Sequence, residues 1–344
     1  MSKGNWYKIP LKRGDYLIIL AREKPKKLEV LEAILRRLPD NDPNYDYYND
    51  IYFRTKSGYD GEQKVDKEWS QINTHKSHYL LHNLELQNHQ IDTLYICPNF
   101  LLILEIKNIS GHLDFEYEKH QFLRTRNDGS KEGFYNPIDQ VLRHARYLQS
   151  FNLKIPIEYA IVISNSSTII GNTPGNIPIF HASGIHQHIE LLTKKYSNYN
   201  ISPKRLNETV ELLIKHHNPR IWRFELETDK LLRGMICDNC NHKQPMKYYH
   251  GNWICNNCGK KGKEVLFTGL KDYRLLIDNK IRNKEFRTFF NIPSQDIAAR
   301  ILTRLNLPFE GNKKGRVYTI PPDFTNESIK ENGNNVKEIV RINI

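Results

Sequence analysis

The chain has 344 residues, of which 39% are hydrophobic and 26% charged, and its formal net charge is +12. The length is enough for two or three domains, whereas the longest apolar run falls far short of the about 20 residues that a membrane helix needs. We therefore expect a cytoplasmic protein without a membrane partner, because the short run Tyr16–Leu20 also lacks the cleavage site of a secretory signal.

Residues 1–57 form an extension that precedes the first recognisable domain. Apolar residues recur with helical spacing over Lys27–Leu38, which predicts a helix with one apolar face. Pro39–Pro43 ends this helix, and a stretch rich in Tyr, Asn and Asp follows it. A second helix is expected over Glu62–His75, where apolar residues again recur with helical spacing.

The next region contains two segments that are predicted to pair as a hairpin. The runs Leu94–Ile96 and Phe100–Leu104 are both apolar, as is typical of buried strands. Pro98-Asn99 between them is typical of a turn. A strand is also expected just before this hairpin, over Tyr79–Leu84.

Three charged residues flank the hairpin. Asp92 lies at the start of the first strand, while Glu105 and Lys107 end the second and project from one face of it. Buried charges are disfavoured unless they pair or bind a metal, so we expect the three side chains to meet. Two carboxylates can hold Mg²⁺ or Mn²⁺, and the lysine can position or activate an attacking water. The alternative interpretation is that Glu105 and Lys107 form a solvated strand face.

The chain then alternates between strands and helices. We expect a hairpin over His112–Arg126, a helix over Asn136–Phe151, a buried strand over Ile157–Ile163, and helices over Ile185–Tyr196 and Pro203–His216. Gln140 and His144 lie four residues apart in the first of these helices and therefore share a face.

Five motifs follow one another between Gly58 and Asn165. They are Gly61-Glu62, Gln90-Ile91-Asp92-Thr93-Leu94, Leu104-Glu105-Ile106-Lys107-Asn108, Gly111, and Asn136-Pro137-Ile138-Asp139-Gln140. Their order resembles the nuclease-related domain (NERD) family of restriction-endonuclease-like nucleases. The resemblance implies an α/β fold with a mixed central sheet flanked by helices, and metal-dependent cleavage of nucleic acid. It points to these catalytic residues: Glu62, Asp92, Glu105, Lys107 and Gln140, with Asp92 and Glu105 holding the metal.

Four of the five cysteines form two close pairs. The pairs Cys237-x₂-Cys240 and Cys255-x₂-Cys258 are separated by fourteen residues, which is typical of a four-thiolate zinc site. Short strands expected between the pairs complete the layout of a zinc ribbon. We expect one structural Zn²⁺, because four protein ligands close such a site. Lysines and aromatic residues around the ligands favour contact with nucleic acid, although they also suit an ordinary ribbon surface.

The C-terminal region is predicted to contain a helix-turn-helix and a wing. Short helices are expected over Lys284–Phe290 and from Ser294 to about Asn306, where Ser294 caps the second helix. The basic glycine turn Gly311–Arg316 before the strand Val317–Ile320 resembles the wing of a winged-helix domain. The side chains expected to contact DNA are Gln295, Arg300, Arg304, Lys313, Lys314 and Arg316. The alternative is a small helical module that mediates protein contacts.

These observations predict a nuclease-like domain with two appended modules that engage DNA. The expected segments are an N-terminal helical extension (1–57), a nuclease-like domain (58–218), a linker (219–233), a zinc ribbon (234–267), a winged-helix-like module (268–322) and a polar tail (323–344). The excess of positive charge in the last third favours a polyanionic partner.

The function expected from this organisation is that of a Mg²⁺-dependent DNA endonuclease, with RNA a weaker candidate substrate. A double-strand cut needs two nuclease sites, so a homodimer is a reasonable assembly. The alternative is a DNA-binding regulatory protein whose nuclease fold is inactive. The target site, the strand preference and a role in phage defence, repair or mobile elements stay open.

Overall fold

The computed structural model describes residues 16–71, 78–222, 224–240, 243–249, 251–322 and 324. Contacts within the chain define two compact units, Met1–Lys24 with Lys56–Ile221 and Pro25–Thr55 with Trp222–Ile344. The expected N-terminal extension (1–57) is divided between these two units. The boundaries of the six expected segments stay a prediction. The expected polar tail lies outside the described residues except for Phe324.

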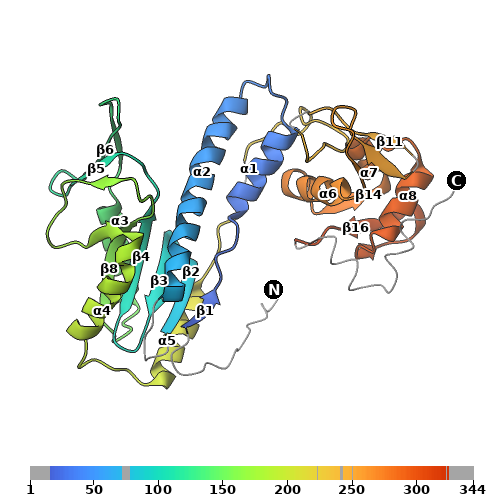
Figure 1. The fold of residues 1–344 in the computed structure, drawn as a ribbon. Helices are drawn as coiled ribbons and strands as arrows, with labels where there is room; N and C mark the ends of the chain where they lie inside the picture. Colours follow the sequence, from blue (N-terminus) through green and yellow to red (C-terminus); the bar gives the residue numbers. More distant parts are fainter. Residues whose placement is uncertain are drawn as a thin grey trace. The chain divides into compact units, whose positions relative to one another are not determined.

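The first unit is built on a mixed β-sheet (Figure 1). Within the described residues its strand order is β1 (Tyr16–Leu20), β2 (His78–Leu86), β3 (His89–Ile96), β4 (Leu101–Lys107), β8 (Ile157–Ile163) and β10 (Ile179–His181). Strands β2, β3 and β4 are antiparallel, whereas β1 is parallel to β2, and β4, β8 and β10 are parallel to one another. The predicted hairpin and the mixed α/β fold are confirmed.

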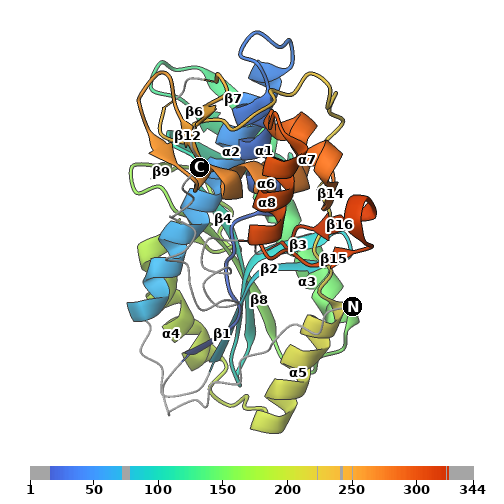
Figure 2. The ribbon, with the colours of Figure 1, turned by 90° about the vertical axis from the view of Figure 1, so that its right-hand side faces the viewer.

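Helices cover both faces of this sheet, as Figure 2 shows for α4 (Ile185–Lys195) and α5 (Pro203–His216). Because side chains alternate along a strand, Leu101 and Ile103 of β4 pack on the side of α5 and of α3 (Pro137–Ser150). Leu102 and Leu104 point the other way and pack on the side of α4. The predicted helices in this region and the strand β8 are therefore present at their expected positions.

A smaller sheet adjoins the end of β4. Its strand order is β7 (Lys131–Tyr135), β6 (Gln121–Thr125), β5 (His112–Glu116) and β9 (Ile169–Ile170). The hairpin of β5 and β6 was predicted, whereas β7 and β9 were not. Leu113, Phe115 and Phe122 bury their side chains beneath this sheet together with Ile138 and Val141 of α3.

The longest helix differs from its prediction. Helix α2 runs without interruption over Tyr45–Asp66 and continues as the 3₁₀ helix η1 over Lys67–Gln71. It therefore begins 17 residues before the expected start at Glu62, and the expected end at His75 lies outside the described residues. Residues 45–61, which include most of the Tyr-, Asn- and Asp-rich stretch between the two expected helices, are thus helical.

The reason for this error is the glycine content of α2. Gly58 and Gly61 each cost about 1 kcal/mol of intrinsic helix stability relative to alanine, so the local sequence does not favour a continuous helix. Packing outweighs this cost, because Tyr48 is buried near the start of α2 and Val65 is buried near its end. Tyr48 belongs to the second unit and Val65 to the first.

The second unit contains a three-stranded antiparallel sheet around the cysteine pairs. Its strands are β11 (Lys247–Tyr249), β12 (Asn252–Ile254) and β13 (Lys261–Gly262). The first two are the short strands expected between the pairs. This layout, together with the cysteine positions, fits a zinc ribbon.

Three helices and three short strands follow. They are α6 (Val265–Leu276), β14 (Lys280–Arg282), α7 (Asn283–Phe290), α8 (Gln295–Arg304), β15 (Phe309–Glu310) and β16 (Val317–Thr319), and the strand order in the sheet is β14, β16, β15. Helices α7 and α8 and strand β16 lie where they were predicted, and Ser294 caps α8 through its hydroxyl. Helix α6 was not predicted.

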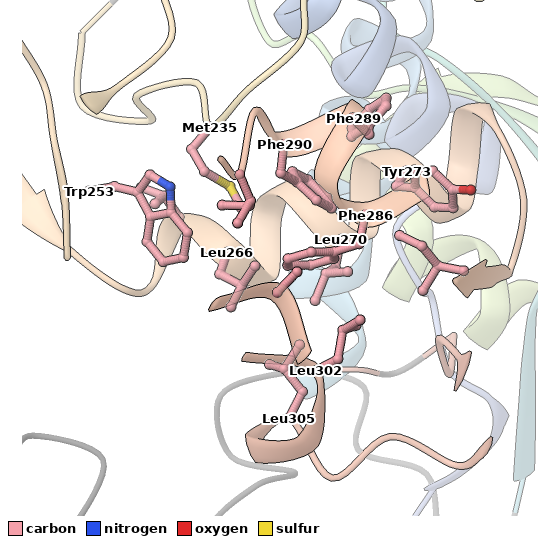
Figure 3. Close-up of a cluster of buried hydrophobic side chains, with 14 of the residues drawn as sticks. Met235, Trp253, Leu266, Leu270, Tyr273, Phe286, Phe289, Phe290, Leu302 and Leu305 are labelled. Atoms are coloured by element: carbon pink, nitrogen blue, oxygen red, sulfur yellow. The ribbon is translucent and has the colours of Figure 1, made fainter. Parts of the chain in front are cut away.

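The core of the second unit explains why α6 forms. Leu266, Leu270 and Tyr273 of α6 are buried together with aromatic residues of α7, as Figure 3 shows. A Cβ atom at Gly269 would lie 2.9 Å from a ring carbon of Phe290 and 3.0 Å from Met235 Sδ. Gly269 therefore lowers the helix propensity of this segment, but it also allows α6 to pack closely against Phe290 and Met235.

Helix α1 (Lys26–Arg37) also belongs to the second unit. Arg37 is fully buried, and its Nε lies 2.8 Å from Asp272 Oδ2 on α6. Its Nη1 donates to the carbonyl oxygens of Leu232 and Gly234 at 3.0 and 2.9 Å. Removing one partner of such a buried pair leaves an uncompensated charge, so this contact links the N-terminal helix to the C-terminal half of the chain.

Candidate functional site

The end of β4 brings Glu105 and Lys107 together. Lys107 Nζ lies 2.7 Å from Glu105 Oε1, and it donates to Gln140 Oε1 of α3 at 3.4 Å. The side chains of Glu105 and Lys107 are 2% and 23% exposed. The face formed by this pair is therefore buried beneath α3, and the interpretation as a solvated strand face is wrong.

Asp92 reaches the same place from β3. The register pairs Thr93 with Leu104, so the strands bring Asp92 and Glu105 to the same end of the hairpin. Asp92 Oδ2 accepts a hydrogen bond of 2.8 Å from the backbone N–H of Ile106. The structure thus brings Asp92, Glu105 and Lys107 together at the end of this hairpin, as predicted.

Glu62 joins the cluster from α2. A residue that the sequence analysis missed, Arg22, holds Glu62 in place through an ion pair. Arg22 Nε also lies 2.7 Å from Asp66 Oδ2, and its Nη2 donates to the carbonyl oxygen of Asp92 at 3.1 Å and to Thr93 Oγ1 at 2.8 Å. The Arg22 side chain is only 3% exposed. The one feature of the sequence that could have indicated Arg22 is its position two residues after the apolar run Tyr16–Leu20.

The close approach of α2 to the strand ends depends on Gly61. A Cβ atom there would lie 2.4 Å from Asn108 Cβ and 2.7 Å from Ser164 Oγ. Both distances are far below van der Waals contact, so a larger residue cannot be accommodated without movement. Asn108 directly follows Lys107, and its amide donates to the carbonyl oxygen of Ser57 at 2.8 Å. The helix that carries Glu62 is therefore fitted against the end of β4.

Burial and mutual repulsion perturb the three carboxylates. Burial, followed by the nearby charge of Asp92, raises the pKa of Glu105 to about 8 and that of Glu62 to about 8. Burial also raises the pKa of Asp92, against the opposing influence of Lys107 and of the Ile106 N–H. Burial lowers the pKa of Lys107, but the charges of Glu105 and Asp92 outweigh it, so the net change is upward and the ammonium stays protonated.

A histidine pair lies beside Glu105. His144 of α3 places its Nε2 4.0 Å from Glu105 Oε2, and its Nδ1 lies 3.0 Å from His89 Nδ1. His89 in turn stacks on Tyr147 with ring centroids 4.3 Å apart. Burial lowers the pKa of His144 to about 4, so its imidazole is neutral at physiological pH. The signal in the sequence was the spacing of His144 four residues after Gln140.

The carboxylate cluster has the donors that a hard divalent cation requires. Oxygen ligands suit Mg²⁺ and Mn²⁺, and a bound cation would offset the burial that raises the pKa of all three carboxyl groups. Glu105 Oε2 is buried without a hydrogen-bond partner among the described residues. These residues therefore fit a bound divalent ion, with Asp92 and Glu105 as its expected ligands.

The four cysteines form a separate and more compact group. Among the described residues, they are the one set of three or more acidic, histidine or cysteine ligand atoms that all lie within 4.8 Å of one another. Cys237 Sγ lies 3.6 Å from Cys258 Sγ, and Cys240 Sγ lies 3.6 Å from Cys255 Sγ. Four sulfurs bound at about 2.3 Å in a tetrahedron would be about 3.8 Å apart. A backbone hydrogen bond from Lys260 lowers the pKa of the Cys258 thiol to about 6, which favours the thiolate that binds zinc.

The residues predicted to contact DNA occupy two places in the second unit. Gln295, Arg300 and Arg304 are exposed on α8, while Ala298 and Leu302 face the core. Lys313 is exposed in the turn between β15 and β16, and the guanidinium of Arg316 lies over the ring of Phe309 at 4.1 Å. The side chain of Lys314 lies outside the described residues.

No helix in the described parts of the chain is long and apolar enough to cross a bilayer.

Comparison with known families agrees with this geometry. The family model of the nuclease-related domain matches residues 57–164. We found no significant match to the chain among curated proteins or among solved structures. The matched range contains Glu62, Asp92, Glu105, Lys107 and Gln140, whereas Arg22 lies outside it. The segment that builds the carboxylate–lysine cluster is therefore a nuclease-related domain.

Proposed function

We propose that this protein is a metal-dependent nuclease that cleaves phosphodiester bonds in DNA. The observation that carries the proposal is the convergence of Asp92, Glu105 and Lys107 at the end of one hairpin, within a nuclease-related domain. Cleavage of a phosphodiester needs a positioned nucleophile and positive charge next to the phosphate. A cluster of buried carboxylates beside a protonated lysine can provide both.

Each residue of the cluster has a role in this proposal. A divalent ion held by Asp92 and Glu105 would stabilise negative charge on the phosphate and lower the pKa of a bound water. Lys107 stays protonated, so it positions the attacking water and stabilises the developing charge. Gln140 fixes the lysine through its amide oxygen, and Glu62 adds a further carboxylate to the site.

The second unit is proposed to supply affinity for DNA. The four thiolates hold one Zn²⁺ that stabilises the ribbon, because small modules of this kind depend on the ion for their fold. The elements from α6 to β16 support a winged-helix-like module. They follow one another as helix, strand, helix, helix, strand and strand, and β16 lies between β14 and β15 in the sheet. In that arrangement α8 would approach the bases, and the turn that contains Lys313 would contact the phosphate backbone.

The test is cleavage of plasmid DNA by the full chain with Mg²⁺, with Mn²⁺ and with EDTA. We expect EDTA-sensitive nicking or linearisation that Glu105→Gln and Lys107→Met each reduce by at least about 100-fold, because electrostatic groups of this kind contribute about 3–4 kcal/mol to catalysis. DNA binding should remain, since the second unit is unchanged. Glu158→Gln is the matched control, because Glu158 is also a strand glutamate paired with a lysine, at 2.7 Å from Lys195, but lies outside the cluster.

The outcomes separate two classes of protein. Wild-type rates for both cluster variants would refute the assigned site. Tight DNA binding without cleavage under any metal would instead favour a DNA-binding regulatory protein whose nuclease fold is inactive. Competition between duplex DNA and RNA in the same assay addresses the substrate class.

A further inference from the structure

We propose that a polar groove beside the end of β4 binds the phosphate backbone of DNA, with Arg124 and Arg126 as its phosphate contacts. This inference rests on the proposed function, because it takes the substrate to be DNA. It adds a binding surface within the first unit, next to the carboxylate–lysine cluster and separate from the modules of the second unit.

The groove has a volume of about 770 Å³ and is lined by the end of β6, the turn after it and the loops that follow β4 and β8. Asp128, an acidic residue of the lining, accepts hydrogen bonds from the N–H and the hydroxyl of Ser130 at 2.9 and 2.6 Å, so its carboxylate is engaged within its own turn. Hydroxyl, amide and guanidinium groups line most of the groove, from Ser110, Thr125, Ser167, Asn127, Arg124 and Arg126. Groups of these kinds make most protein contacts to phosphate and sugar.

The chain connections place the groove close to the cluster. Ser110 follows Lys107 by three residues, so their Cα atoms lie at most about 11 Å apart. Gly111 has a φ of +103°, and a Cβ atom there would lie 2.6 Å from the carbonyl oxygen of Thr125. This glycine therefore allows the loop after β4 to pass closely against β6. Successive nucleotides of a duplex strand rise by about 3.4 Å, so the groove begins within about three nucleotides of the cluster.

Arg124 and Arg126 converge on one carboxylate. Their Nη2 atoms both donate to Oε2 of Glu132, and the distance from Arg126 is 2.8 Å. The hydrogen bonds from Arg126 and from Arg124 lower the pKa of Glu132. Phosphate oxygens accept hydrogen bonds from arginine in the same way as carboxylate oxygens. Glu132 therefore occupies a position in which the two guanidinium groups would hold a phosphate oxygen.

The contact with Glu132 can be exchanged for a phosphate. The side chains of Glu132 and Arg126 are 41% and 53% exposed, and ion pairs between exposed side chains contribute little net stability. Arg124 is only 17% exposed, and its guanidinium lies over the ring of Phe134 at 5.4 Å. Its Nε is buried without a hydrogen-bond partner among the described residues. One arginine is thus held in place by packing, while the other arginine and the carboxylate are accessible to a ligand.

DNA binding by the zinc-loaded full chain tests the groove without an activity assay. Fluorescence anisotropy of a labelled duplex, without added Mg²⁺ or Mn²⁺, gives the dissociation constant at several salt concentrations. Arg126→Gln should weaken binding about 3- to 10-fold near about 0.1 M salt, and it should reduce the slope of log affinity against log salt by about 1. Glu132→Gln should instead strengthen binding by a similar factor, because both arginines are then open to phosphate.

Lys119→Gln and Glu116→Gln are matched controls for these two variants. Lys119 and Glu116 form an ion pair of 3.4 Å at the turn between β5 and β6, at the other end of β6 from the groove. Each control changes the net charge of the first unit by the same amount as its counterpart. Both controls should leave the dissociation constant and the salt slope unchanged.

Unchanged binding and slope in Arg126→Gln, or unchanged or weaker binding in Glu132→Gln, overturns the inference. Equal shifts in the two controls also overturn it, because they would assign the effect to net charge alone. If the wild-type chain still cleaves plasmid DNA in that case, the proposed nuclease stands. Opposite shifts in Arg126→Gln and Glu132→Gln without cleavage under any metal would support the groove and refute the proposed nuclease.

Discussion

Two glycines of α2 allow a paired test of how this helix fits against the site. Gly58 and Gly61 lie three residues apart in the same helix, and alanine is the better helix former at both positions by about 1 kcal/mol. Their surroundings differ. A Cβ atom at Gly58 meets nothing within 4 Å, whereas one at Gly61 would lie 2.4 Å from Asn108 Cβ and 2.7 Å from Ser164 Oγ.

We therefore expect the two substitutions to have opposite effects on stability. Gly58→Ala should raise the free energy of unfolding by about 0.5–1 kcal/mol, because the unfolded chain loses freedom and nothing is displaced. Gly61→Ala should lower it by about 1–3 kcal/mol, because forcing a methyl group into a filled space displaces the helix or Asn108. In a domain of this size each kcal/mol shifts the melting temperature by about 2–4 °C.

Differential scanning calorimetry of the metal-free variants measures the stability difference, and the plasmid assay measures its consequence for the site. Movement at Gly61 acts on Asn108, which follows Lys107, so cleavage should fall in Gly61→Ala and remain in Gly58→Ala. Equal stabilisation by both alanines would show that α2 does not approach the end of β4 as closely as described. Equal destabilisation would show that the helix itself does not tolerate alanine.

Three other predictions follow from the charged groups. Arg22→Gln should weaken Mn²⁺ binding by freeing Glu62, whereas Arg22→Lys should retain part of it, and a calorimetric titration measures both. Because the pKa of Glu105 rises from 4.5 to about 8 on folding, its contribution to stability is complete below about pH 4.5 and is lost as the pH rises through 8. Urea unfolding of the metal-free protein should therefore show a decline of about 2–4 kcal/mol between pH 5 and 9 that Glu105→Gln reduces and saturating Mn²⁺ opposes; a flat profile would contradict the assigned burial. Cys258→Ser should lower the zinc content measured by mass spectrometry and expose the ribbon to proteolysis, and full zinc retention would argue against a four-thiolate site.

Local sequence patterns were sufficient for the features that depend on near neighbours. Strand periodicity and the Pro98-Asn99 turn identified the hairpin of β3 and β4, and the hairpin brought Asp92 close to Glu105. The spacing of the cysteines predicted their close approach, because two residues between ligands suffice to form each half of the site. The cap of α8 at Ser294 was predicted from its hydroxyl and its position before an apolar helical face.

The positions of α2, Arg22 and His144 were decided by the tertiary structure. Helix α2 contains glycines that disfavour it locally, and it is stabilised by burial at both ends, which a short window of sequence does not contain. Arg22 and Asp92 are 70 residues apart and meet because β1 pairs in parallel with β2, next to β3. His144 reaches Glu105 because α3 packs on that face of the sheet. The amino-acid sequence alone thus predicted which side chains meet at the hairpin and at the cysteine pairs. The tertiary structure alone decided that Arg22 and His144 lie beside the hairpin. These contacts join residues that are far apart in the sequence, so they depend on the order of the strands and the packing of the helices and not on any local pattern.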